Sequence, residues 1–576
     1  MNRLDAPLPA PPLPAPLRIR EFACAALVAW PFLSPLAGGP SINVWQQLMT
    51  WGCLAGLFAM APSAFPSRGL RVGLAVIACF AVLSAAVGTG ATLLLPTLGA
   101  LAGVATAACL GAGAMQHRGP LVRALAAGLL AAGLLSALLG LLQYYGFTEF
   151  LGPLTSSPPT GRAWGNLRQR NQFATLISMA LVAALWWHAA HRSRRARGLL
   201  APAAVLLIAA LVASGSRTGV LQLVLIVAGA SVMAWRERRV ASQPAGDFRL
   251  PAPAILLAAI PLYAALHWFM PYLASGGDVG HAATAGSGML HRLQPATVSS
   301  DSRVVLWRNV LSLIAQRPFT GWGWGELSFA HFATLYNGPR FPVILDNAHN
   351  LPLHLAVELG IPAALLICGG FLWMVWTAKP WRERDPLRLM AWGLLGVILL
   401  HSLLEYPLWY GPFQLVFGLC LGILWPAPQP LSDRSKANGK KLAAFAAAAW
   451  MAVIGYAAWD YTRISQIYLP RDARMPAYRD DTLAKLQGSW LFSRQVDFAE
   501  VTLTAVTPAN AAHMHELAGR VLHFSPEPRV IMKLIESAEL LGRDAEAHAL
   551  AERFRVAFPA AFARWLDNRP DDAPEL

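Results

Sequence analysis

Charged residues are scarce in this chain. Lys, Arg, Asp and Glu make up only 13% of the 576 residues, whereas 56% are hydrophobic and the mean hydropathy is +0.45. A soluble protein carries about a quarter charged residues, so this composition excludes an ordinary soluble domain. The apolar residues come in runs of about twenty, which is the length that crosses a bilayer core as a helix. The sequence therefore predicts an all-α, polytopic membrane helix bundle.

We expect about 12–13 transmembrane helices in this bundle. Apolar runs without an interrupting charge cluster define the predicted spans, which lie near 19–37, 43–62, 70–88, 91–114, 121–146, 171–189, 198–214, 218–235, 252–272, 352–377, 386–404, 409–426 and 441–460.

Cysteine is also sparse, and its placement excludes two further classes of protein. The six cysteines all fall inside predicted spans, where cysteine behaves as a small hydrophobe, so we expect neither a disulfide framework nor a metal site. The first 20 residues are rich in proline and lack the apolar segment and cleavage site of a signal peptide. We expect them to form a disordered cytoplasmic tail.

The net charge of +15 does not indicate nucleic acid binding, because its placement follows membrane topology. Positive residues concentrate in cytoplasmic loops of membrane proteins. With the N-terminus inside, the basic runs 192–197, 236–249, 379–388 and 434–441 all fall in cytoplasmic loops. The short outer loops hold only Arg162, Arg168, Arg170 and Arg217. We therefore expect membrane lipids and no nucleic acid as partners.

The outer arginines are candidates for binding an anion. RAWGNLRQRNQF (162–173) leads directly into a predicted span, so the amides of a helix N-terminus and the guanidinium groups would lie together. Arg217 stands in the tight turn SGSRTG with no acid nearby in sequence. Snorkelling to lipid headgroups is the alternative for each arginine, and Gln169 could be a simple loop amide.

The long outer loop contains two more candidates. Residues 301–329 predict an amphipathic helix capped by Asp301 or Ser302, which places Arg303 in its first turn. Asn350 is a plausible N-cap of the next span, and His349 then stands at its outer mouth, where it could act as a base or simply cap the helix.

Three other polar residues near the outer ends of spans have structural alternatives. His354 and Glu358 share a helix face and fit a buried polar pair, whereas Tyr406 in HSLLEYPLWYG could be an ordinary interfacial tyrosine. The outer loops show no acidic cluster that would hold Mg²⁺ or Mn²⁺, so arginines would have to neutralise a bound diphosphate.

Five motifs occur in order along the chain: GNLRQRNQ, SGSRTG, SRVVLW, RPFTGWGWG and AHNLPLHLAVELG. Together they resemble the O-antigen ligase and polymerase superfamily. The GNLRQRN and HSLLEYPLWY elements and the polar C-terminal region are similar, more narrowly, to PglL-type bacterial protein O-oligosaccharyltransferases. The resemblance covers most of the chain from about residue 150 onward, and the first five spans match only in being apolar.

The resemblance implies a metal-independent glycosyltransferase without a cofactor. It would move a preassembled glycan en bloc from undecaprenyl diphosphate to Ser or Thr of a periplasmic protein such as a type IV pilin. Carried over by motif, Arg217 and Arg303 would hold the diphosphate, and His349 would orient or deprotonate the acceptor hydroxyl. The donor would be bound by the remaining outer-loop residues Gln169, Arg168, Arg170, Arg162, Asn171 and Tyr406.

The expected location is the bacterial inner membrane, with the active site facing the periplasm. The expected parts are 1–18, a cytoplasmic tail; 19–146, N-terminal transmembrane helices; 147–272, transmembrane helices with outer motif loops; 273–351, a large periplasmic loop; 352–460, C-terminal transmembrane helices; and 461–576, a periplasmic helical domain. In the last part, the LGRDAEA turn resembles a tetratricopeptide unit, and an ordinary helical hairpin is the alternative.

Three other functions stay open at this point. An O-antigen ligase would use the same donor with lipid A–core as acceptor, and an O-antigen polymerase would extend another lipid-linked glycan. A transporter or flippase of an anionic lipid would line a pathway with its arginines. The clustering of the arginines at the outer face, and the absence of paired interrupted spans in corresponding halves, argue against transport.

Overall fold

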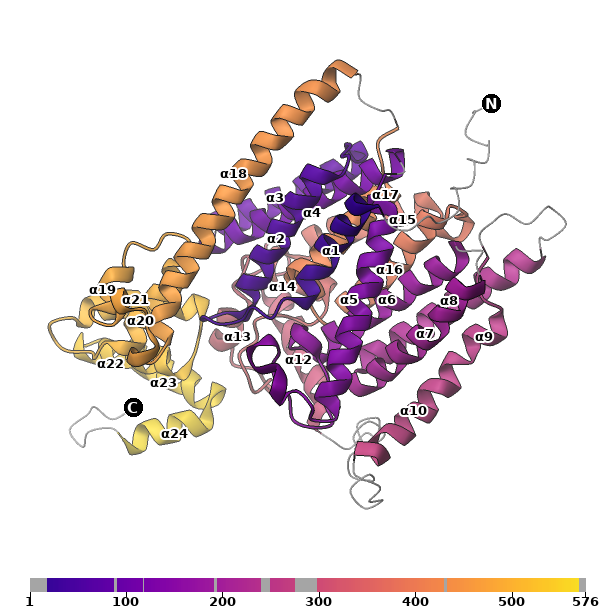
Figure 1. The fold of residues 1–576 in the computed structure, drawn as a ribbon. Helices are drawn as coiled ribbons and strands as arrows, with labels where there is room; N and C mark the ends of the chain where they lie inside the picture. Colours follow the sequence, from indigo (N-terminus) through magenta and orange to yellow (C-terminus); the bar gives the residue numbers. More distant parts are fainter. Residues whose placement is uncertain are drawn as a thin grey trace.

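The computed structural model describes residues 18–87, 91–117, 119–190, 194–239, 249–274, 298–428 and 433–568 (Figure 1). Throughout these ranges the regular structure is helical, and β pairing is limited to one isolated bridge between Pro66 and Pro426. The all-α prediction is confirmed. The predicted cytoplasmic tail lies almost wholly outside the described residues.

The first half of the chain supplies most of the bundle. Its helices are α1 (Ile19–Leu33), α2 (Ile42–Met60), α3 (Arg68–Val87), α4 (Ala91–His117), α5 (Leu121–Tyr144), α6 (Arg170–Ala190), α7 (Arg194–Ser214), α8 (Arg217–Arg239), α9 (Pro253–Leu257) and α10 (Ala259–Ala274).

The second half adds the outer helices, the last bundle helices and a C-terminal unit. The helices are α12 (Val298–Gln316), α13 (Leu327–Ala333), α14 (Leu351–Leu359), α15 (Ile361–Ala378), α16 (Pro386–Ser402), α17 (Gly411–Leu424), α18 (Asp433–Ser465), α19 (Thr482–Leu486), α20 (Ser493–Leu503), α21 (Ala511–Phe524), α22 (Pro528–Leu540), α23 (Asp544–Ala557) and α24 (Pro559–Asp567).

In the described part of the chain, seven helical stretches are long and apolar enough to cross a membrane. They are Arg68–Ala85, Leu94–His117, Leu121–Tyr144, Arg170–Ala190, Arg217–Arg239, Pro253–Leu273 and Ile361–Arg382. Three further apolar stretches are shorter, namely Gly198–Ser214 in α7, Pro386–Ser402 (α16) and Gly411–Leu424 (α17). The chain is therefore a multi-pass membrane protein. Each of the thirteen predicted spans overlaps at least one of these helices, and the number that crosses the bilayer stays a prediction.

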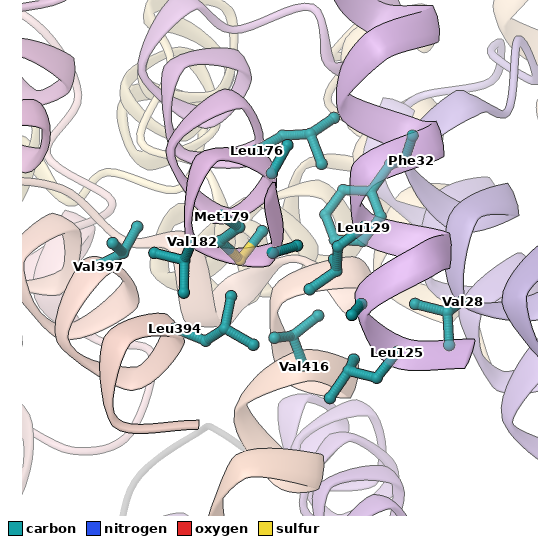
Figure 2. Packing of buried hydrophobic residues seen from close by; sticks show 14 of the residues in the cluster. Val28, Phe32, Leu125, Leu129, Leu176, Met179, Val182, Leu394, Val397 and Val416 are labelled. Carbon is teal, nitrogen blue, oxygen red and sulfur yellow. The ribbon is translucent and has the colours of Figure 1, made fainter. Parts of the chain in front are cut away.

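The core of the bundle forms around α6, which packs against α5, α7, α8 and α16. Apolar side chains from five helices meet there (Figure 2), among them Phe32, Leu129, Met179, Val397 and Val416. Small residues permit the closest helix contacts, as is usual inside membranes. A Cβ atom on Gly422 of α17 would lie 1.9 Å from the Ala108 carbonyl oxygen of α4, so only glycine fits at this crossing.

The predicted span 352–377 is not one helix, because the chain breaks at Gly360 into α14 and α15. Gly360 has φ +86°, a left-handed backbone that favours glycine. The glycine-rich segment after α12 closes over this break: the Gly323 amide donates to the Glu358 carbonyl, and the Ile361 amide donates to the Pro318 carbonyl. The GWGWG motif thus holds a short outer helix, α14, at a fixed position relative to the membrane helix α15.

A second correction concerns α12, which already includes Val298 instead of starting after Asp301 or Ser302. Arg303 therefore lies beyond the first turn, and its position is set by packing of α12 and not by proximity to a cap. Buried Leu306, Val310 and Leu313 make that packing with the α13 and α14 region.

The C-terminal helices α20–α24 form a separate core that includes one segment of the long outer loop. Phe332 of α13 is buried in this core, and the ring of Phe329 stacks on His523 of α21 at 3.8 Å between centroids. His523 Nδ1 also lies 2.6 Å from Glu326 Oε2. Helix α13 therefore attaches the C-terminal unit to the outer loop, and Figure 1 places both at the same end of the bundle.

His331 of α13 is the buried titratable group of this junction, with 2% of its surface exposed. Its Nε2 lies 3.1 Å from the Phe341 carbonyl oxygen, which only accepts, so Nε2 carries the proton. Nδ1 then accepts from the Tyr336 hydroxyl at 2.8 Å. Burial, with a smaller effect of the nearby Arg340 charge, lowers the pKa of His331 to about 4. The fold therefore requires the neutral ring.

We expect stability to fall in acid because of this histidine. Its folded pKa lies below the unfolded value of 6.5, so the contribution is complete above pH 6.5 and is lost as pH falls through about 4. The loss amounts to about 3 kcal/mol. His331→Gln keeps a donor and an acceptor without titrating, so its thermal unfolding should depend less on pH than that of wild type. Exposed His548→Gln is the control, and an equal acid loss in His331→Gln would contradict the assignment.

Candidate active site at the outer end of the bundle

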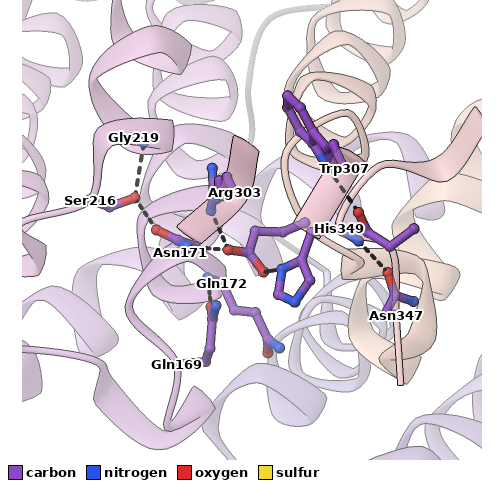
Figure 3. A network of polar contacts seen from close by, with 11 residues as sticks. Gln169, Asn171, Gln172, Ser216, Gly219, Arg303, Trp307, Asn347 and His349 are labelled. Atoms are coloured by element: carbon purple, nitrogen blue, oxygen red, sulfur yellow. Dashed lines mark hydrogen bonds and ion pairs between the residues drawn. The ribbon is translucent and has the colours of Figure 1, made fainter. Parts of the chain in front are cut away.

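Five chain segments meet at the end of the bundle that carries α12–α14. They are the start of α6, the turn between α7 and α8, the middle of α12, the loop before α14 and the loop between α16 and α17. Each segment contributes a polar side chain in a region otherwise built from apolar helices, and Figure 3 shows them converging on one another.

The carboxylate of Glu405 lies at the centre of this convergence. Its Oε1 is 2.6 Å from Nη2 of Arg303 and accepts a second hydrogen bond from Nδ2 of Asn171 at 3.1 Å. Its Oε2 is 2.8 Å from Nδ1 of His349. Three segments that are distant in sequence are therefore joined through one side chain.

Glu405 is 8% exposed, and its environment favours the ionised form. Burial alone would raise the pKa of the carboxyl group, but the hydrogen bond from His349 and the positive charge of Arg303 contribute to lowering the pKa below its usual value. A carboxylate held ionised beside an imidazole fixes the position of the ring proton on Nδ1, which leaves Nε2 with a free lone pair.

His349 is held in an uncommon backbone conformation. Its φ is +51°, in the left-handed region, and its amide donates to the side chain of Asn347 at 2.9 Å. The indole of Trp307 donates to the carbonyl of the preceding Ala348 at 3.1 Å, which fixes the loop against α12. Strained backbone of this kind persists only where the surroundings enforce it, and it clusters at functional sites. Nε2 of His349 has no hydrogen bond to any of the described residues.

Asn171 connects this centre to the N-terminus of α8. Its Oδ1 accepts from the Ser216 hydroxyl at 2.6 Å, and the Ser216 oxygen accepts from the Gly219 amide at 3.1 Å. Arg217, the first residue of α8, is exposed beside this chain of bonds and pairs with no described residue. The site thus has one arginine bound to its carboxylate and a second one exposed at its edge.

The predicted site residues separate into two groups. His349, Arg303, Asn171 and Tyr406 come together around Glu405, and the ring of Tyr406 meets that of His349 edge-on at 5.0 Å. Gln169 lines a crevice beside Tyr406.

Gln169 also accepts from the Gln172 amide at 2.6 Å, so it caps the start of α6. Arg168 does not point to the centre: its guanidinium donates to the Pro35 carbonyl at 2.9 Å. Arg162 and Arg170 are exposed. The donor-binding roles of these residues stay predictions.

Glu405 is the central residue to which the sequence interpretation gave no role. The sequence did mark Glu405 as unusual, because it is the lone acid in a turn between two apolar helices, where a charge is costly. The partner could not be identified, since Arg303 and His349 lie 102 and 56 residues away. His354 and Glu358 form the expected buried pair, at 3.4 Å. Within the described ranges, no group of three or more His, Cys, Asp or Glu is arranged to hold a metal ion.

Comparisons with known protein families match the parts of the chain that contribute residues to this site. Residues 163–188 match the protein glycosylation ligase family, residues 202–368 match the O-antigen ligase family, and residues 389–570 match the C-terminal part of the virulence factor membrane-bound polymerase family. The chain is thus a multi-pass membrane protein that is similar to the O-antigen ligase family over residues 202–368. Its similarity to the protein glycosylation ligase family is confined to residues 163–188, which include most of α6.

Two relatives with curated functions are similar to parts of the chain. A general O-oligosaccharyltransferase of Acinetobacter baylyi is 24% identical over 309 residues, which are 51% of this chain and 49% of the relative. A ComP-specific O-oligosaccharyltransferase of the same organism is 24% identical over 180 residues, 29% of this chain and 31% of the relative. The similarity thus spans about half of the first relative and a third of the second.

Asn171 offers a test of the polar centre that does not depend on activity. Asn171→Ala removes a bond to Glu405 and leaves the buried Ser216 hydroxyl without its acceptor, which should cost about 2–3 kcal/mol. Arg162→Ala removes an exposed side chain and should change stability by no more than about 0.5 kcal/mol. Thermal unfolding of the purified variants measures both. Equal stability of Asn171→Ala and wild type would show that the bonds do not hold the centre together.

Proposed function

We propose that this protein is a metal-independent protein O-oligosaccharyltransferase. It transfers a preassembled glycan en bloc from undecaprenyl diphosphate to Ser or Thr of periplasmic proteins such as type IV pilin. The observation that carries the proposal is the Arg303–Glu405–His349 arrangement, which puts a base and an anion-binding group on one carboxylate. The protein glycosylation ligase match and the two oligosaccharyltransferase relatives support the acceptor class.

His349 would act as the base. Glu405 accepts the Nδ1 proton, so Nε2 is free to take the proton of the acceptor hydroxyl as its oxygen bonds to the anomeric carbon of the glycan. The bond from that carbon to the phosphate oxygen breaks, and the lipid diphosphate leaves with the electron pair. A positioned base of this kind typically contributes about 10²–10⁴-fold in rate.

Arg303 and Arg217 would stabilise the departing diphosphate. Arg303 uses one nitrogen for Glu405 and keeps other guanidinium donors free, and 38% of its side-chain surface is exposed. Arg217 stands at a helix N-terminus, where backbone amides also favour anions. Guanidinium groups that are already in place when charge develops on phosphate oxygens lower the barrier without reorganising solvent.

The orientation of the site and the protein acceptor are parts of the same proposal. The basic runs at the opposite ends of the helices support a periplasmic position for this end, because positive residues concentrate in cytoplasmic loops. The C-terminal helical unit lies at the same end as α13 and is attached through it, so it would offer an acceptor protein a surface on this side of the bundle.

An O-antigen ligase or polymerase would use the same chemistry with a different acceptor. The O-antigen ligase match over 202–368 and the polymerase match over 389–570 favour these alternatives. They differ from the proposal only in what supplies the hydroxyl, namely lipid A–core or another lipid-linked glycan.

The arginine roles are tested by Arg217→Ala and Arg303→Ala in membranes supplied with a lipid-diphosphate glycan and an acceptor. Each should lose about 10²–10³ in transfer rate while the protein still accumulates. Glu405→Gln should lose at least as much, because the amide no longer specifies the His349 tautomer and no longer pairs with Arg303. Arg308→Ala, exposed on the same helix as Arg303, is the matched control. Near-normal transfer by both arginine variants would refute the diphosphate role.

The acceptor is identified by the intact mass of pilin from cells that make this protein or its His349→Ala variant. A glycan-sized mass should be present with the wild type and absent with the variant. Unmodified pilin in both strains, with a lipopolysaccharide ladder that depends on this protein, would instead establish the ligase alternative.

A further inference from the structure

The loop that follows α5 exposes its large apolar side chains. Phe147 is 64% exposed, Phe150 is 76% exposed and Leu154 is 60% exposed. Glu149 is the only charged residue between positions 146 and 160. Figure 1 shows this loop at the end of the bundle that carries α12. Exposed apolar side chains that gather in one short segment mark a surface that something else covers.

Polar side chains of the same region point inward and hold the loop together. Gln143, in the last turn of α5, is fully buried. Its Oε1 accepts from the amides of Trp164 at 3.1 Å and Gly165 at 2.8 Å. Its Nε2 donates to the Thr155 hydroxyl at 3.0 Å and to the Ser156 carbonyl at 2.9 Å. The loop is therefore fixed from the inside by polar groups and shows apolar groups outside, which is the reverse of a loop in water.

The length of α5 places the start of this loop at the surface of the bilayer. Arg123, in the first turn of α5, lies 3.3 Å from Glu21 and marks the headgroup level at the far end, because charges are costly in hydrocarbon. No charged residue follows it in α5. The hydrocarbon core is about 30 Å thick and a helix rises about 1.5 Å per residue, so a core that begins at Arg123 ends near Gln143.

The loop then folds back onto the end of α5 instead of continuing away from the membrane. The Phe147 amide donates to the Leu142 carbonyl at 2.8 Å, which keeps Phe147 level with the last turn of the helix. Leu142 shares one face of α5 with Leu135 and Leu138, which are 53% and 51% exposed. This face is the one that lipid covers in a membrane-spanning helix, and the apolar loop begins where it ends.

We infer that the tip of this loop, residues 147–154, lies in the interfacial layer of the bilayer, where Phe147, Phe150 and Leu154 contact phospholipid acyl chains. Aromatic side chains at the level of the headgroups hold a membrane protein at a fixed depth. The single charge, Glu149, is exposed and reaches the headgroup water. This inference does not depend on the proposed function.

The anchor would set the depth of the polar centre. The loop runs from the tip through Trp164 and Gly165, which Gln143 holds, to the start of α6, where Asn171 bonds Glu405. A rigid connection between the tip and Asn171 keeps the Glu405 carboxylate at a constant height relative to the headgroups. A substrate carried by a membrane lipid would present its phosphates at that same level.

The test is a depth measurement with a nitroxide spin label on Phe150→Cys in the full-length protein. Cys79→Ser removes the exposed native cysteine, and the other five are buried or partly buried. The protein is placed in nanodiscs of phosphatidylethanolamine and phosphatidylglycerol that contain no lipid diphosphate. Collisions are measured with oxygen, which concentrates in the bilayer, and with a water-soluble nickel chelate. The label should favour oxygen and report a depth of about 5–10 Å below the headgroups.

Two reference positions calibrate the measurement. Leu135→Cys, on the exposed face of α5, should favour oxygen more strongly than the loop label. Glu516→Cys, on α21 with 78% of its side chain exposed, should favour the nickel chelate. Cys79→Ser protein without an added cysteine, taken through the same labelling, gives the background signal to subtract. Leu154→Cys repeats the loop measurement, so that lowered stability of Phe150→Cys does not leave the question open.

Two outcomes would overturn the inference. Labels at both loop positions that favour the nickel chelate as strongly as the Glu516→Cys label would place the tip in water. Immobile labels that neither reagent reaches would show that protein covers the tip instead of lipid. Recovery of access in nanodiscs that hold one protein molecule each would then identify that cover as a second copy of this chain.

Discussion

A single buried carboxylate organises the end of this membrane protein that carries α12–α14. Few charges are tolerated near a bilayer core, and an unpaired one would be neutralised instead of kept. Glu405 stays ionised because Arg303, His349 and Asn171 approach it from three different segments. The same hydrogen bonds also fix the geometry of the site. Bonding to Glu405 holds the guanidinium of Arg303 and orients the imidazole of His349, and Asn171 connects α6 to α8 through Ser216. The stability of this end of the protein and its chemistry thus depend on the same bonds.

The apolar runs predicted the bundle because membrane insertion imposes a length on each segment that can be read without tertiary structure. Motif resemblance made Arg217, Arg303 and His349 candidates, since each lies within a short conspicuous stretch, and their roles stay predictions. Glu405 was harder to assign because its importance comes from partners 56 and 102 residues away, which a linear pattern does not contain. The break at Gly360 was missed for a related reason: the apolar run continues across it, and only the GWGWG segment packed on top shows that the helix ends there.

Arg168 illustrates the opposite case, in which a suggestive residue has a structural contact. Its guanidinium reaches the Pro35 carbonyl after α1, in a left-handed backbone conformation at φ +57°. Proximity in sequence to Gln169 and Asn171 made it an equal candidate for binding a donor, yet neighbouring residues at the start of a helix point in different directions. Asn171 faces the carboxylate, Gln169 caps the helix, and Arg168 anchors the loop to the first helix of the bundle.

The attachment of the C-terminal unit through α13 has a consequence for how this unit can be exchanged between related proteins. Because Phe332 belongs to the core of that unit, the boundary in sequence near the end of α18 is not a boundary in space. A chimera that exchanges only the residues after α18 would leave a foreign helix in the new core and an unmatched Glu326 beside it. A modular exchange therefore has to carry the segment from Pro318 to Ala333 together with the C-terminal helices, as one discontinuous unit.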